Sequence, residues 1–270
     1  MAALELMTTR HDDRLAAIVL GASNVSRGLA RLAAAVRGRW SGPVDLFVAA
    51  GHGRSYGANS RVWIRRLPSI LGSGLWRALD RERVGGGAGR TVALVTDVGN
   101  DLLYGFTPAQ LATWVDEGVA RLVDRGATVA LTRLPLDAIA TVGGVRYRLL
   151  RTLFVPRCPL SLAEVGAAAA EIDGRIAEIA GRRGARLVDQ PGHWYGLDAL
   201  HPRRRRLDTL WHAVCDAWGL PAAPGPTRAS FREWMRLGTR GAEVRSLARR
   251  ALFTPQPAHR FPGGDTVALY

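Results

Sequence analysis

Four short stretches of the sequence hold groups that nucleophilic catalysis needs. Ser23 follows an apolar run in AAIVLGASNVSRG, Gly53 lies in GHGRSYG, and Asn100 lies in VGND, while Asp198 and His201 share the stretch GLDALHP. Acyl transfer uses a hydroxyl nucleophile, a base beside it, a group that orients the base, and donors aimed at an oxyanion. The five residues together supply all of these groups.

The spacing of Asp198 and His201 favours direct contact between their side chains. Because Pro202 disfavours the α region for the residue before it, DALH is predicted to be a turn that leads into a helix with Pro202 in its first turn. The first and last Cα atoms of such a turn lie within ~7 Å of each other. Asp198 can then accept a hydrogen bond from one ring nitrogen of His201 and leave the other to face Ser23.

Three donors are candidates for the oxyanion site. The backbone N–H of Gly53 can approach a substrate closely because glycine has no Cβ, although Gly51 in the same loop is an alternative that the sequence leaves open. Asn100 offers its side-chain amide. The N–H of Ser23 lies at the start of a predicted helix, where the helix dipole favours negative charge.

Each group also has an ordinary structural explanation. Ser23 could cap a helix, Gly51 and Gly53 could only turn the chain, Asn100 could cap the next helix, and Asp198 could bond locally. We favour the catalytic interpretation because chance would otherwise have to place five acyl-transfer groups at one edge of a sheet.

The elements that position these residues alternate between strand and helix. Continuous apolar runs predict strands of a parallel sheet covered on both faces, over 16–21, 43–50, 91–98, 127–134 and 185–189. Helical patterns occur between and after them, over 26–37, 59–80, 108–125, 161–182 and 203–218. This alternation predicts an α/β fold, a three-layer α/β/α sandwich with a central parallel sheet, whose strands bring their carboxyl ends to one edge.

The four stretches, in this order and on these strand ends, resemble the motif blocks of the SGNH (GDSL-type) hydrolases over residues of about 14 to 218. The resemblance implies a flavodoxin-like fold, ester hydrolysis without a cofactor or metal, and a catalytic triad of Ser23, Asp198 and His201. It also implies an oxyanion hole formed by Ser23, Gly53 and Asn100. Three positions depart from the family pattern: Ala22 precedes the serine, Asn24 follows it, and Val98 replaces a glycine of the third block.

The chain is predicted to divide into a hydrolase domain, 1–220, and a basic C-terminal extension, 221–270, packed on it. The apolar side of 227–253 is expected to pack back onto the domain, and it consists of Phe231, Trp234, Met235, Leu247 and Leu252. Residues 136–160 form a long insert after the fourth strand, where a pocket wall or lid is expected.

Composition limits the partners. The 270 residues are 47% hydrophobic, without an apolar run of the ~18 residues that a membrane span needs or the layout of a signal peptide, so a cytoplasmic protein is expected. The net charge is +14 and all 37 basic residues are arginine, which predicts weak binding to anionic surfaces but no specific nucleic acid. Cys158 and Cys215 are expected to be small buried residues.

The expected substrate is a small-molecule, carbohydrate or lipid ester; its acyl and alcohol parts and the oligomeric state stay open. A Rossmann-type nucleotide site is disfavoured, since the spacing in GHGRSYG is wrong for it and no acidic residue follows the next strand. An α/β-hydrolase would need glycine at Val25. The non-enzymatic alternative is a catalytically inactive scaffold of this fold that binds an anionic polymer or membrane surface through its arginine-rich surface and its basic C-terminal tail.

Overall fold

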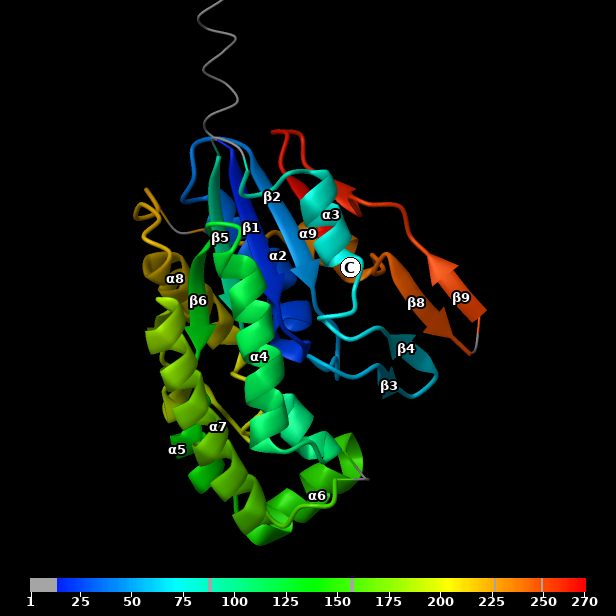
Figure 1. Ribbon diagram of the computed structural model, residues 1–270, viewed down its shortest axis with the longest axis vertical. Helices are drawn as coiled ribbons and strands as arrows, with labels where there is room; N and C mark the ends of the chain where they lie inside the picture. The colour runs from blue at the N-terminus through cyan, green and yellow to red at the C-terminus, as the bar shows by residue number, and fades with distance from the viewer. Residues whose placement is uncertain (1–13, 87–88, 156–157, 226, 249) are drawn as a thin grey trace, which may run out of the picture.

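Five parallel strands form the centre of the computed structural model. Figure 1 shows their arrangement. The structure describes residues 14–86, 89–155, 158–225, 227–248 and 250–270. In chain order the strands are β1 (Leu15–Leu20), β2 (Val44–Ala49), β5 (Arg90–Val95), β6 (Thr128–Thr132) and β7 (Arg186–Val188). Their spatial order is β2-β1-β5-β6-β7, the strand order of flavodoxin-like folds. The five predicted strands are confirmed.

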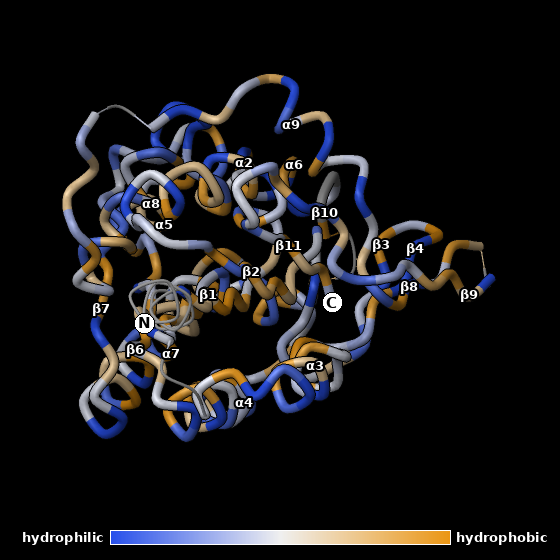
Figure 2. The backbone as a smooth tube through the Cα atoms, turned by 90° about the horizontal axis from the view of Figure 1, so that it is seen from above, coloured by the Kyte–Doolittle hydropathy of each residue, from blue (hydrophilic) through white to orange (hydrophobic). Residues whose placement is uncertain are grey.

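Helices cover both faces of this sheet, as Figure 2 shows in a view from above. Leu15, Ala17 and Val19 of β1 pack with α2 (Ser23–Arg37) and α8 (Leu207–Ala217), whereas Ile18 and Leu20 pack with the helices of the opposite face. Those helices are α3 (Leu75–Arg81), α4 (Pro108–Val123) and α7 (Leu162–Arg183). The three-layer α/β/α sandwich predicted from the sequence is thus confirmed.

The prediction of one helix over 59–80 is wrong. Residues after the glycine loop form a hairpin of β3 (Ser60–Val62) and β4 (Arg65–Leu67), and only α3 at the end of the range is helical. Pro68 cannot donate a helix hydrogen bond, and Gly72 and Gly74 disfavour helix further. The hairpin also gains a partner strand from the C-terminal part of the chain.

The C-terminal part contains α9 (Phe231–Gly238), β8 (Val244–Leu247), β9 (Arg250–Phe253), β10 (His259–Arg260) and β11 (Thr266–Leu269). Strand β11 pairs in parallel with β2 and, with antiparallel β10, extends the central sheet. Strands β8 and β9 join the hairpin in a second sheet of order β3-β4-β8-β9. The division of the chain after residue 220 stays a prediction.

The expected packing of the apolar side of 227–253 is wrong for four of its five residues. Phe231, Trp234, Met235 and Leu247 are exposed, Leu252 is half-buried, and Leu237 is the buried residue of α9. The helix ends at Gly238 and the chain continues as strands, so these residues do not share one face.

Shorter elements complete the sheet edge where the strands end. They are the 3₁₀ helices η1 (Val98–Tyr104), η2 (Gly192–Trp194) and η3 (Arg204–Arg206), and the helices α5 (Leu136–Ala140) and α6 (Gly144–Phe154) of the insert. Cys158 and Cys215 are both buried, as predicted. Within the described residues, no helix is long and apolar enough to cross a membrane.

Candidate active site

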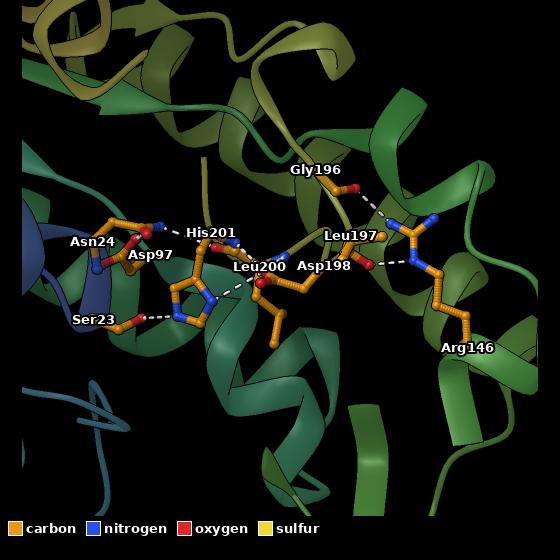
Figure 3. A network of polar contacts seen from close by, with 9 residues as sticks. All are labelled: Ser23, Asn24, Asp97, Arg146, Gly196, Leu197, Asp198, Leu200 and His201. Atoms are coloured by element: carbon orange, nitrogen blue, oxygen red, sulfur yellow. Dashed lines mark hydrogen bonds and ion pairs between the residues drawn. The ribbon is translucent and has the colours of Figure 1, made fainter. Parts of the chain in front are cut away.

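Ser23, His201 and Asp198 form a hydrogen-bonded relay at the carboxyl ends of the strands (Figure 3). His201 Nε2 lies 3.0 Å from Ser23 Oγ, and His201 Nδ1 lies 3.0 Å from Asp198 Oδ1. Ser23 is the first residue of α2, while the other two lie 178 and 175 positions further along the chain, on the loop before η3. The fold therefore joins two of the stretches that the sequence singles out.

The relay fixes the roles of the two ring nitrogens of a neutral His201. A carboxylate only accepts hydrogen bonds, so Nδ1 donates to Asp198 and Nε2 accepts from the Ser23 hydroxyl. Burial disfavours the charge on Asp198, but hydrogen bonds from the side chain and N–H of His201 and from the N–H of Leu200 outweigh it and lower the pKa of this carboxyl. Asp198 is thus held ionised beside the imidazole.

The Ser23 hydroxyl does not cap α2. The cap residue is Ala22, with no side-chain bond, and the carboxylate of Asp97 serves the helix start from the end of β5. Asp97 Oδ2 accepts hydrogen bonds from the N–H groups of Ala22 at 2.7 Å and Asn24 at 3.0 Å. The capping explanation of Ser23 is wrong, and its oxygen is left to face His201.

Asn24 links this turn to the loop that carries His201. Its Nδ2 donates to Asp97 Oδ1 at 2.7 Å and to the carbonyl oxygen of Leu200 at 3.1 Å. Burial raises the pKa of Asp97, although the bonds from Ala22 and Asn24 oppose that effect. Sequence analysis missed this pair of residues; the signal available was their position directly after two adjacent strands.

The loop with Asp198 and His201 is closed at its base rather than continued into a helix. Pro202 forms an isolated β-bridge with Tyr195, and the N–H of Arg203 donates to the carbonyl oxygen of Trp194 at 2.8 Å. The predicted place of Pro202 in the first turn of a helix is wrong, because α8 begins only at residue 207. The bridge gives the loop a fixed base.

A contact from the insert fixes the middle of the same loop. Arg146 of α6 donates to the carbonyl oxygens of Gly196, at 2.6 Å, and Leu197, and Figure 3 shows its guanidinium turned toward both. These contacts lie directly before Asp198. Arg146 is a second residue near the site that sequence analysis missed.

The glycine loop after β2 is tied to η1, the element that carries Asn100. The Tyr104 hydroxyl donates to the Gly53 carbonyl oxygen at 3.1 Å, and Asp101 accepts from the N–H of Tyr56 at 2.9 Å. Burial, then the charges of Arg65, His201 and Arg27, lowers the pKa of His52. The loop is therefore held against η1 and lies within the electrostatic reach of His201.

Gly53 and Asn100 do not bond to the relay directly. Among the described residues no hydrogen bond joins either of them to Ser23, and none accepts from the Ser23 N–H, the Gly53 N–H or the Asn100 side-chain amide. Asn100 lies inside η1 rather than at a helix cap. Three donors that the sequence names are thus without acceptors in this part of the protein.

A cavity of about 110 Å³ lies beside these groups. Asn100 and Leu200 contribute to its wall. Apolar residues of η1 and the insert also line it, including Leu102, Leu103, Ile139, Val142, Leu150 and Val155. The insert therefore forms a pocket wall, as predicted. No cluster of three His, Cys, Asp or Glu side chains that could hold a metal ion occurs among the residues the structure describes.

No family model and no curated protein matches the chain. Among solved structures it is similar to the psychrotrophic esterase EstA from Pseudoalteromonas sp., at 15% identity over 75% of this chain and 95% of that one, with a TM-score of 0.42. It is similar also to TesA (16% identity, 75% and 97% coverage, TM-score 0.42) and to the acetyl xylan esterase AlAXEase (10%, 74% and 98%, 0.44). Likenesses this distant do not identify a substrate or a site residue.

Proposed function

We propose that the protein is a serine hydrolase of the SGNH type that cleaves a carboxylic ester. Ser23 is the nucleophile, His201 the general base, and Asp198 the group that orients and stabilises the imidazole. The observation that carries this proposal is the relay itself, with Nε2 and Nδ1 of one imidazole 3.0 Å from a serine hydroxyl and a carboxylate. These distances lie within hydrogen-bond reach, which proton transfer from the nucleophile requires.

The reaction runs in two halves. Ser23 Oγ attacks the ester carbonyl carbon while His201 Nε2 takes the hydroxyl proton, and the tetrahedral intermediate collapses as that proton passes to the leaving alcohol. Water then attacks the acyl-Ser23 ester, again losing a proton to His201. The second intermediate expels Ser23 Oγ, which regains the proton, and the carboxylic acid leaves.

The oxyanion of both intermediates is bound by the N–H of Ser23, the N–H of Gly53 and the amide of Asn100. This assignment is supported by two observations. Among the described residues no group accepts a hydrogen bond from these three donors, and hydrogen bonds hold the glycine loop against η1, the element that carries Asn100. Gly53 suits the role better than Gly51: its φ of +67° is a backbone conformation that favours glycine, and a Cβ there would meet the Tyr104 hydroxyl. A Cβ at Gly51 would instead meet Leu67 of the hairpin.

The apolar cavity next to Asn100 receives the apolar part of the ester. An empty engineered cavity of ~150 Å³ with a similar apolar lining binds benzene, so a volume of about 110 Å³ suits a short acyl chain. The substrate class that fits best is a small-molecule or lipid ester with a short apolar acyl group.

The test is hydrolysis of p-nitrophenyl esters of increasing chain length by the full chain and three variants. Ser23→Ala and His201→Ala are expected to lower kcat by roughly 10⁴-fold or more, as loss of a triad member does. Ser26→Ala is the matched control, because Ser26 lies one turn along α2 and, among the described residues, its hydroxyl bonds to the Ala22 carbonyl oxygen alone. Ester hydrolysis that survives in Ser23→Ala would overturn the proposal.

A further inference from the structure

The four-stranded sheet β3-β4-β8-β9 stands out from the α/β body and ends in two adjacent turns (Figure 1). Trp63 and Ile64 form the turn between β3 and β4, and Ala248 begins the turn between β8 and β9. The Ala248 N–H donates to the Ile64 carbonyl oxygen at 3.0 Å, which holds the two turns side by side. We call Trp63, Ile64, Leu247 and Ala248 the hairpin tips.

The hairpin tips are apolar where the surface is most exposed. Trp63 is 88% exposed and Ile64 is 58% exposed. Trp63 also has φ of 57°, in the first position of a two-residue turn, where glycine is preferred and a bulky residue is strained. Since both the exposure and the backbone conformation disfavour tryptophan, the folded structure alone gives no reason for this residue.

The strands that carry the hairpin tips are rich in arginine. The ranges 58–67 and 244–253 together contain six arginines and no acidic residue. No arginine in the described part of these two ranges forms an ion pair with a carboxylate. Burial and the neighbouring charge of Arg245 both lower the pKa of Arg65, which agrees with crowded cations.

Arg61 and Arg66 lie directly opposite each other on β3 and β4. Like charges in this cross-strand position destabilise a sheet unless an anion lies between them. The two side chains, with Ile64 and Ala248, line a hollow of about 280 Å³. Arg61 Nε donates to the Trp63 carbonyl oxygen at 3.1 Å, and among the described residues neither guanidinium forms an ion pair. The hollow therefore combines two guanidinium groups without a carboxylate partner there and an apolar wall next to an exposed tryptophan.

We propose that the hairpin tips dock on an anionic lipid bilayer, with Trp63 and Ile64 in the interface and a lipid headgroup phosphate between Arg61 and Arg66. Tryptophan is enriched at membrane interfaces, and arginines beside an apolar apex contact lipid phosphates. A nucleic acid would instead need its cations and aromatic rings along one groove, rather than an apolar apex with the cations behind it.

The docking site adjoins the candidate active site. Arg65 Nη2 donates to the His52 carbonyl oxygen at 2.8 Å, and a Cβ at Gly53 would meet Val62 of β3. A protein docked through the tips would thus hold its glycine loop close to the bilayer. Docking itself does not depend on the proposed hydrolysis, so Ser23→Ala is expected to bind as the wild type does.

The experiment is co-flotation of the full chain with vesicles of equal parts phosphatidylcholine and phosphatidylglycerol, compared with phosphatidylcholine alone. The wild type is expected to bind only the anionic vesicles. Arg61→Gln with Arg66→Gln is expected to weaken binding by about 25-fold, roughly fivefold for each arginine. The matched control is Arg77→Gln with Arg81→Gln, which removes the same charge from exposed positions of α3 and is expected to weaken binding far less.

A second variant tests the apolar apex without risk to the fold. Trp63→Gly with Ile64→Ser places glycine where φ is positive, so the melting temperature is expected to hold while binding falls by about tenfold. Phe231→Ser is the control, because Phe231 is an exposed aromatic residue on α9, and it is expected to leave vesicle binding unchanged. Equal binding by the tip variants and the wild type, or no binding to anionic vesicles, would overturn the proposal. Displacement by inorganic phosphate, or loss of oligonucleotide binding instead of vesicle binding in the tip variants, would overturn it too.

Discussion

Asn24 and Asp97 are the residues through which the nucleophile turn and the histidine loop are held together. The family that the sequence resembles has a carboxylate directly before the serine, where this chain has Ala22. Here Asp97 reaches the same turn from the adjacent strand, and Asn24 extends its contacts to the carbonyl oxygen of Leu200. Asn24 therefore helps to hold the loop that carries His201 in place relative to Ser23, and it also contributes to the wall of the cavity beside the site.

This positioning role predicts a defect in turnover rather than in substrate affinity. Asn24→Ala removes the hydrogen bond to Leu200, the residue before His201. The variant is expected to lower kcat about tenfold with KM unchanged, because a tenfold change in rate corresponds to about 1.4 kcal/mol, the contribution of one hydrogen bond. Asn24→Asp is expected to be worse because two carboxylates would then face each other. A normal kcat in Asn24→Ala, measured on the best p-nitrophenyl ester, would contradict the role.

Substitutions at Asn100 distinguish a role as an oxyanion donor from a purely structural role of its side-chain amide. If its amide meets charge that exists only in the transition state, Asn100→Ala lowers kcat by roughly 10²–10³ with little change in KM. Asn100→Asp keeps the shape but repels the oxyanion, so it is expected to be at least as inactive in a protein that still folds. Steady-state kinetics with a thermal melt distinguish the cases, and near-normal kcat in Asn100→Asp would remove Asn100 from the oxyanion site.

At the scale of elements, the sequence predicted what local periodicity determines and failed where distant segments pair. The strands β1, β2, β5 and β6 are mostly apolar runs, so their burial could be read directly, whereas two of the three residues of β7 are exposed. The hairpin at 60–67 reads as helix locally, and its strand partner β8 lies about 180 positions further along the chain. Likewise, β11 completes the sheet beside β2, a pairing that no local pattern shows.

The residues of the site divide in the same way. Ser23, Asp198 and His201 belong to short motifs whose spacing carries chemical meaning, so they could be named in advance. Asp97 and Arg146 act through contacts between segments 50 or more positions apart, and only the fold reveals them.

The role of β11 predicts opposite outcomes for two changes in the C-terminal part of the chain. Val267 of β11 is fully buried, so Val267→Asp places an unpaired carboxylate in the core and is expected to cost about 3 kcal/mol or more. Phe231→Ser on exposed α9 is expected to stay within about 0.5 kcal/mol of the wild type. Urea unfolding measures both, and equal stabilities would contradict the packing of β11 into the main sheet.

At the scale of the whole molecule, one buried carboxyl makes folding depend on pH. Burial of Asp101 raises its pKa to about 6, although hydrogen bonds from Ser55 and Tyr56 oppose the effect. The folded protein then keeps this proton up to about pH 6 and the unfolded chain only up to about pH 4. The stabilisation from this group is therefore complete below pH 4 and is lost as the pH rises through 6.

Replacing this carboxyl should remove that dependence. As the pH rises from 4 to 8, the wild type is expected to lose unfolding free energy relative to Asp101→Asn. The expected relative change is on the order of 3 kcal/mol, at 1.36 kcal/mol for each unit of pKa shift. Unfolding free energies of both proteins at the two pH values provide the measurement. A difference between the two proteins that is the same at both pH values would show that Asp101 is not titrating in the folded state.

Ser23 is proposed to be a nucleophile activated by His201 and Asp198. Covalent labelling of the serine tests this proposed role. A fluorophosphonate reacts with an activated serine and leaves an adduct that peptide mass mapping locates. We expect one adduct, on Ser23, with labelling lost in Ser23→Ala, much slowed in His201→Ala, and unchanged in Ser26→Ala. An adduct on another residue, or an unlabelled Ser23 in a protein that hydrolyses esters, would contradict it.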